Sequence, residues 1–213
     1  MRTYWTLLKR EIIDHVAYFA AALILSGLLT AMLVSVLLSF DESDRELFGL
    51  AGGIPATVAV VVGLGGLGVA QMYGDRARNI SAFLTALPVT RAQIFIARIA
   101  AGVLVILILL LPLAVAATML LGPNVDGVPV YRGTVPDVFR GLFLMCLACY
   151  SVGIYAGWHR RSLAPTLGVL PVVLLVPLLL VIKGFGPDSA AVLAIFILAC
   201  LAGTWCRFAS SSL

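Results

Sequence analysis

Apolar residues fill most of this chain in long runs that are separated by short polar segments. A run of about 20 apolar residues, folded as an α-helix, is long enough to cross the hydrocarbon core of a bilayer. The runs predict six membrane spans, at 17–40, 50–73, 93–121, 139–158, 163–183 and 189–206. The pattern therefore predicts an all-α integral membrane protein, with a single membrane domain over residues 1–213.

The segment before the first span, residues 1–16, has a different pattern. Its apolar residues recur with helical spacing on one face, and most of its polar residues fall on other faces. The apolar face consists of Trp5, Leu8, Ile12 and Val16. This arrangement predicts an amphipathic helix that lies in the membrane surface. The alternative is a solvated beginning of the first span.

Residues 74–91 are the polar segment with the most local order. Apolar residues at steps of three and four predict a short amphipathic helix there; they are Ala77, Ile80, Leu84 and Leu87. Pro88 ends this helix because it lacks a backbone N–H and restricts the residue before it. Thr90 and Gln93 then have the spacing of a capping box for the next span. The alternative is an ordinary connecting loop.

Composition supports the membrane class, and the distribution of charge predicts which segments are cytoplasmic. The chain is 62% hydrophobic and 11% charged, whereas soluble domains carry roughly 25% charged residues. Positive side chains gather on the cytoplasmic side of membrane proteins. Ten of the 14 lie on one side of the predicted spans, namely Arg2, Lys9, Arg10, Arg76, Arg78, Arg91, Arg98, Arg160, Arg161 and Arg207. Both termini and residues 74–91 are therefore predicted to be cytoplasmic.

The segments on the other side are predicted to be outer loops, at 41–48, 122–137 and 184–188. The first contains an acidic cluster, which predicts a solvated turn or a cation-binding site; it consists of Asp41, Glu42, Asp44 and Glu46. Four cysteines lie inside apolar runs and are expected to be small buried residues. They are Cys146, Cys149, Cys200 and Cys206.

Several function classes need residues that the spans lack. No Asp, Glu, Lys, Arg or His lies in the central part of a predicted span, although proton relays, ion-coupled transporters and voltage sensors need such groups there. Neither an H-E-x-x-H motif nor a G-x-x-x-x-G-K-[ST] loop is present in the sequence. The chain is thus expected to be no enzyme, to hold no cofactor or metal of its own and to bind no nucleic acid.

Small residues predict close helix packing. A stripe with steps of four and three runs along the second span; it consists of Gly52, Ala56, Ala59, Gly63, Gly66 and Ala70. Shorter motifs are Gly153-x-x-x-Gly157 and Ala199-x-x-x-Gly203. These residues either pack helices within the chain or form a subunit contact. Three prolines in the fifth span predict either a hinge or a buried helix that tolerates proline.

This layout resembles the type-2 ABC transporter permease family. The resemblance rests on Leu7-Leu8-Lys9-Arg10-Glu11 in the first helix and on Phe83-Leu84-Thr85-Ala86-Leu87-Pro88-Val89-Thr90-Arg91 after the second span. In that family a similar L-P-[VL]-[ST]-R turn follows a short cytoplasmic coupling helix, which docks on a separate ATPase subunit. Asp75 stands where the family often has Glu, and Asn79 where it often has Gly, so the details of that contact differ.

The resemblance implies a permease half in a prokaryotic plasma or inner membrane, paired with a second half and with ABC ATPase subunits that bind ATP and Mg²⁺. Its implied coupling residues are Asp75, Arg76, Arg78, Asn79, Ile80, Phe83, Leu84, Pro88, Thr90 and Arg91, and its implied interfacial residues are Trp5, Leu8, Lys9, Arg10 and Glu11. The apolar spans favour a hydrophobic or amphiphilic substrate. The alternatives are a membrane subunit that conveys ATPase work without transport, a haem-exporter-like subunit and an intramembrane enzyme.

Overall fold

The computed structural model describes residues 2–39, 42–77, 90–120, 131–157, 175 and 186–210. This part of the chain is all helical. Its helices are α1 (Arg2–Asp14), α2 (Val16–Ser39), α3 (Glu42–Ala77), α5 (Arg91–Leu120), α6 (Tyr131–Gly157) and α8 (Pro187–Ser210). Five of them, all but α1, are long and apolar enough to cross a membrane. The predicted span at 163–183 lies outside the described residues, apart from Leu175.

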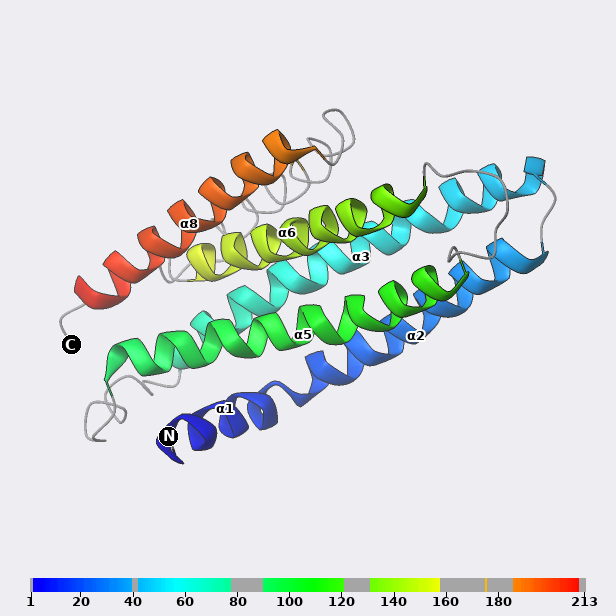
Figure 1. Ribbon diagram of the computed structural model, residues 1–213. Helices are drawn as coiled ribbons and strands as arrows, with labels where there is room; N and C mark the ends of the chain where they lie inside the picture. The colour runs from blue at the N-terminus through cyan, green and yellow to red at the C-terminus, as the bar shows by residue number, and fades with distance from the viewer. Residues whose placement is uncertain are drawn as a thin grey trace.

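The long helices lie side by side as a bundle (Figure 1). Helices α2 and α5 run in one direction, and α3, α6 and α8 run in the other. The described chain ends, Arg2 and Ser210, therefore lie at the same end of the bundle, where α3 ends and α5 begins. We call this the terminal end. A hydrogen bond across it, from Arg91 Nη1 to the carbonyl oxygen of Ala209, measures 3.1 Å.

Glycines bring α3 and α6 into close contact, as the Gly153-x-x-x-Gly157 motif predicted for helix packing. A Cβ added to Gly153 would overlap the carbonyl group of Gly65. A Cβ added to Gly68 would lie 2.6 Å from the carbonyl oxygen of Tyr150, and one on Gly157 would lie 2.8 Å from that of Val69. The two backbones therefore approach to a distance that only glycine permits at these positions.

The predicted small-residue stripe of α3 is not the surface that packs against α6. Gly63 and Ala59 are exposed, and an added Cβ would meet nothing within 4 Å at Gly63 or Gly66. Gly65 and Gly68, which do face α6, lie two residues after Gly63 and Gly66, or about 200° around a helix. Gly63 and Gly66 thus make no close packing contact in the described part of the chain, and both packing within the chain and a subunit contact of the stripe stay predictions.

Two helices, α3 and α6, begin eight residues before the predicted spans. Helix α3 begins at Glu42, so most of the acidic segment 41–48 is helical rather than a loop. Acidic residues stabilise the beginning of a helix because its N-terminus carries a partial positive charge. Helix α6 begins at Tyr131 and includes Pro136 in its second turn. Residues 131–137 of the predicted outer loop 122–137 therefore belong to a helix.

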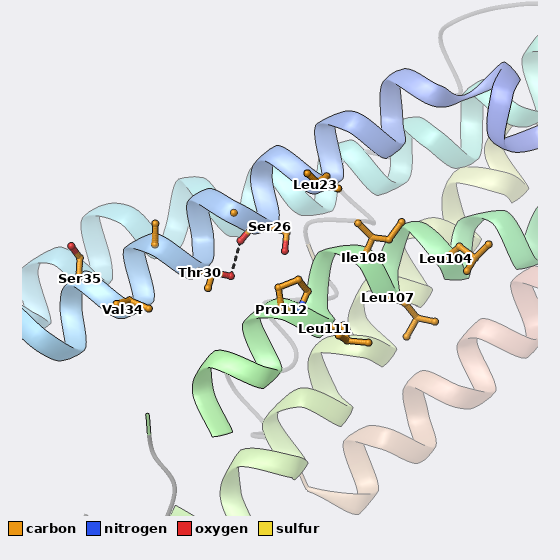
Figure 2. Close-up of a pocket in the computed structure, with 12 residues that line it drawn as sticks. Leu23, Ser26, Thr30, Val34, Ser35, Leu104, Leu107, Ile108, Leu111 and Pro112 are labelled. Atoms are coloured by element: carbon orange, nitrogen blue, oxygen red, sulfur yellow. Dashed lines mark hydrogen bonds between the residues drawn. The ribbon is translucent and has the colours of Figure 1, made fainter. Parts of the chain in front are cut away.

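Helices α2 and α5 pack along each other and leave a groove of about 980 Å³ between them (Figure 2). Its α2 wall includes Ser26 and Thr30, and these residues face Ile108 and Pro112 on α5. The remaining lining is predominantly apolar, with leucines at positions 23, 104, 107 and 111. The groove is therefore a predominantly apolar surface with three hydroxyl groups on its α2 wall, those of Ser26, Thr30 and Ser35.

Candidate functional site

The beginning of α5 is capped as the sequence predicted. The backbone N–H of Thr90 donates to Oε1 of Gln93 over 3.1 Å, and the backbone N–H of Gln93 lies 3.4 Å from Oγ1 of Thr90. These reciprocal contacts form a capping box, which satisfies backbone N–H groups that have no partner inside the helix. The cap fixes the point at which α5 begins.

Replacing Thr90 with alanine is expected to destabilise the protein by about 1 kcal/mol, because the cap loses the acceptor for the Gln93 N–H. Thermal unfolding of the purified protein measures the change. Thr90→Ser keeps the hydroxyl group and should behave as the wild type. Equal losses in the two variants would contradict a capping role.

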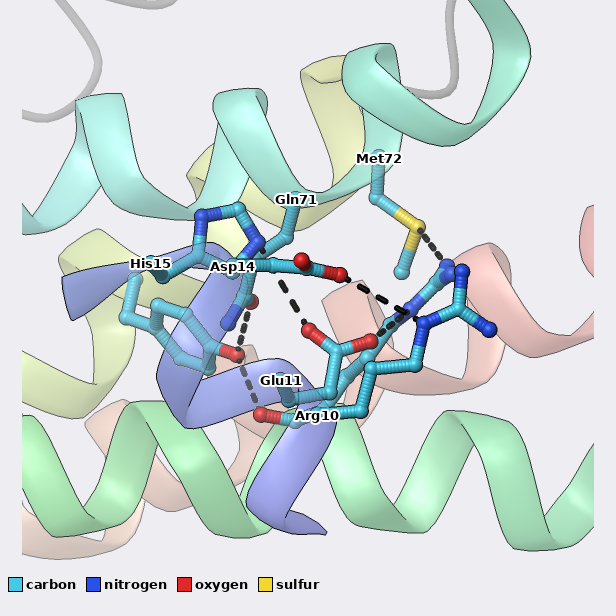
Figure 3. A network of polar contacts seen from close by, with 8 residues as sticks. Arg10, Glu11, Asp14, His15, Gln71 and Met72 are labelled. Carbon is cyan, nitrogen blue, oxygen red and sulfur yellow. Dashed lines mark hydrogen bonds and ion pairs between the residues drawn. The ribbon is translucent and has the colours of Figure 1, made fainter. Parts of the chain in front are cut away.

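A buried arginine lies two turns further along α5. The side chain of Arg98 is 2% exposed, and its Nε lies 3.2 Å from Oε1 of Glu11 in α1. Its Nη1 lies 3.4 Å from Sδ of Met72 in α3. Figure 3 shows the Glu11 carboxylate among these groups, with Met72 on the far side of the network from His15. Arg98 therefore connects three helices at the terminal end.

Glu11 also faces the junction between α1 and α2. Its Oε2 lies 3.6 Å from Nε2 of His15, the residue at which the chain bends from one helix into the other. Both side chains are 17% exposed. The other ion pair of α1, between Arg10 and Asp14, is 3.6 Å long and about half exposed. The side of α1 that faces the bundle is thus partly ionic rather than apolar.

A second set of contacts joins α5 to α3 and α6. The hydroxyl oxygen of Tyr150 lies 2.6 Å from Oε1 of Gln71 and 2.9 Å from the carbonyl oxygen of Arg98. The hydroxyl group has one proton and donates it to one of these acceptors at a time. Gly102 leaves the room for the ring, because a Cβ there would overlap the Tyr150 ring.

Aromatic contacts join the same part of α5 to α8. The ring of Phe95 lies 5.5 Å from that of Trp205 and 6.1 Å from that of Phe208, measured between centroids. These distances are typical of packed aromatic pairs. Together with the bond from Arg91 to Ala209, they attach the C-terminal turns of α8 to the first turns of α5.

Residues 90–98, which we call the α5 base, thus contact four other helices. They reach α8 through Arg91 and Phe95, and α1, α3 and α6 through Arg98. Because these contacts involve buried ionic, polar and aromatic groups, a displacement of the α5 base would disturb all four helices. The α5 base shares Thr90 and Arg91 with the predicted coupling segment 74–91 and is our candidate functional site.

The structure places the predicted coupling residues in three groups. Thr90 and Arg91 form the beginning of the α5 base. Asp75 and Arg76 belong to the last turn of α3, which continues beyond the predicted end of the second span at residue 73. The others lie outside the described residues: Arg78, Asn79, Ile80, Phe83, Leu84 and Pro88.

The predicted interfacial residues do not share one environment. Trp5 is 73% exposed, and Lys9 and Arg10 are also exposed. Leu8 is half-buried, and Glu11 contacts Arg98. Residues 2–14 form the predicted helix, but part of its predicted apolar face points away from the bundle.

Sequence reasoning missed the buried network itself. It assigned Arg98 to the cytoplasmic side as one of many positive charges, and it gave no role to Gln71 or Tyr150. A usable signal was present, because Arg98 lies inside an apolar run and Glu11 supplies an opposite charge on the neighbouring amphipathic helix.

The cysteines offer no metal site in the part of the chain that the structure describes, where no group of three potential ligands occurs. Cys146 and Cys149 are buried, as expected, whereas Cys206 is exposed. Comparison of this chain with protein-family models, with curated proteins and with solved structures finds no match.

Proposed function

We propose that this chain is the membrane-spanning permease subunit of an ATP-driven exporter, with ATP hydrolysis in a separate ABC ATPase subunit. The observation that carries the proposal is the α5 base. A segment with a coupling-helix pattern leads directly into a capped helix beginning that contacts α1, α3, α6 and α8. This arrangement suits a protein whose energy enters from outside the membrane.

The mechanism follows from these contacts. ATP-driven closure of the partner pushes on Ile80, Phe83 and Leu84. Pro88 and the Thr90 cap transmit the movement to the α5 base, and the buried contacts of Arg98 carry it to the other helices. The bundle then rocks as a body between inward-open and outward-open states.

The topology is consistent with this assembly. Helices α6 and α8 run in the same direction (Figure 1). This direction is expected if one further span, predicted at 163–183, lies between them in the sequence. Six spans with both termini in the cytoplasm make one half of a permease. Gly63 and Gly66 of α3, where an added Cβ would meet nothing within 4 Å, are available for close contact with a second half.

Replacing both Phe83 and Leu84 with aspartate is expected to abolish co-purification of an ABC ATPase encoded beside this chain. Two charges on the apolar face of the coupling helix would face an apolar partner surface, which disfavours binding. The measurement is the amount of ATPase recovered with the tagged membrane subunit, together with ATP hydrolysis by the complex.

Ser210→Asp is the matched control, because it adds a charge at the exposed end of α8, at the same end of the bundle. It should leave the amount of recovered ATPase unchanged. Full recovery and unaltered ATP hydrolysis in the double aspartate variant would refute the proposal.

A further inference from the structure

The groove between α2 and α5 contains a buried hydroxyl group without a partner. Ser26 is 2% exposed, and its Oγ makes no hydrogen bond. The other buried serine and threonine in the described chain are satisfied within their own helix: Ser151 donates to the carbonyl oxygen of Leu147 and Thr204 to that of Cys200. The carbonyl group of Ser26 is itself used, because Thr30 donates to it over 2.8 Å.

Such a hydroxyl group is costly inside a membrane. Ser26 lies ten residues after Val16, where the candidate span begins, which corresponds to about 15 Å along a helix. That is half of the roughly 30 Å hydrocarbon core, so bulk water does not reach this depth. A polar group left without a partner there makes the folded protein less stable than an apolar residue at the same position would.

The opposite wall of the groove supplies an acceptor. Pro112 has no N–H, so the carbonyl group of Ile108 lacks its regular helical donor. Ile108 and Pro112 both line the groove and face Ser26 (Figure 2). The groove thus offers a hydroxyl group on one wall and a backbone acceptor on the other. No charged side chain is among its lining residues.

We propose that this groove binds a neutral amphiphile whose uncharged hydrogen-bonding group, a hydroxyl or ester, lies between hydrocarbon parts and pairs with Ser26 Oγ. Its volume of about 980 Å³ is in the range of sites for drug-sized ligands. The uncharged lining disfavours an ionised headgroup at this depth. The ester groups of resident bilayer lipids lie near the interface, about 15 Å from this position.

This inference deepens the proposed function by naming the substrate class, and it is tested separately from the ATPase contact. The chain alone is reconstituted in phosphatidylcholine nanodiscs and labelled with a wax ester, whose ester group lies between two hydrocarbon chains and which carries a photoreactive diazirine on its acyl chain. Peptide mapping locates the labelled residues, and the unlabelled wax ester competes. A diazirine-bearing alkane of equal length, without a polar group, reports simple contact with hydrocarbon.

The wild-type chain should be labelled on α2 and α5 by the wax ester in preference to the alkane. Ser26→Ala should weaken this labelling about three- to tenfold, which is the range for one hydrogen bond between groups inside a membrane. The same variant should unfold at a higher temperature than the wild type, because it removes an unsatisfied hydroxyl group. A purely structural serine would not combine weaker binding with higher stability.

Two further variants complete the test. Gly27→Leu should abolish labelling without misfolding, since Gly27 lines the groove and its added Cβ meets nothing within 4 Å. Ser151→Ala, a change at a satisfied serine of α6, should leave labelling unchanged. Equal labelling by the wax ester and the alkane, or undiminished labelling of Ser26→Ala, would overturn the proposal. If the wild-type chain were labelled specifically but the Phe83 and Leu84 double aspartate variant still bound the ATPase, the permease role alone would be refuted.

Discussion

Replacement of Glu11 with alanine is expected to destabilise the protein by about 3 kcal/mol, the lower part of the range for breaking a buried ion pair. Arg98 would remain 2% exposed and would lose the carboxylate that faces it. For a chain of this size the melting temperature should fall by roughly 6–12 °C. Thermal unfolding in detergent, followed by tryptophan fluorescence, measures the change.

Asp14→Ala is the matched control for this prediction. Asp14 also belongs to an ion pair of α1, but its side chain is 48% exposed, and such pairs contribute about 0–1 kcal/mol. The double variant Glu11→Leu with Arg98→Met should recover most of the lost stability, because it removes both buried charges and keeps apolar volume. Equal melting temperatures for Glu11→Ala and Asp14→Ala would show that the pair does not hold α1 in place.

Replacing Gly153 with alanine is expected to cost about 1–3 kcal/mol or more, as overpacking of a well-packed core does. The new Cβ would overlap the backbone carbonyl of Gly65, and a backbone group cannot turn away as a side chain can. Helices α3 and α6 would have to separate along their closest contact. The loss can be measured as a lower melting temperature and as a smaller yield of monodisperse protein.

The same substitution at Gly63 should have the opposite sign. Gly63 lies in the same helix bundle but is exposed, and an added Cβ there meets nothing within 4 Å. Gly63→Ala should therefore stabilise the helix by about 0.5–1 kcal/mol through reduced backbone freedom in the unfolded chain. If Gly153→Ala and Gly63→Ala were equally stable, the close approach of α3 and α6 would be wrong.

The helices themselves were predictable because apolar runs of membrane length leave few alternatives. The break before α2 and the capping box at Thr90 were predictable for a similar reason, since both depend on local sequence. The beginnings of α3 and α6 were not, because a helix can continue past the membrane surface into polar sequence. Hydropathy marks where a span enters lipid rather than where its helix begins.

Which faces meet was harder to predict. Helix α3 carries glycines in two registers, Gly63 with Gly66 and Gly65 with Gly68, and each has the spacing of a packing motif. Which set packs depends on where the partner helix lies, and the spacing of the glycines does not indicate that position. The pairing of Glu11 with Arg98 joins residues 87 positions apart, so no local pattern could reveal it, although each charge was visible by itself.

That separation in the sequence has a consequence for synthesis in the cell. The ribosome releases Glu11 long before it makes Arg98, and both α2 and α3 are made in the interval. The buried ion pair cannot form until the first turns of α5 have emerged. Docking of the N-terminal helix on α5 therefore comes after α2, α3 and the first turns of α5 have been made, although α1 is the first helix to be synthesised.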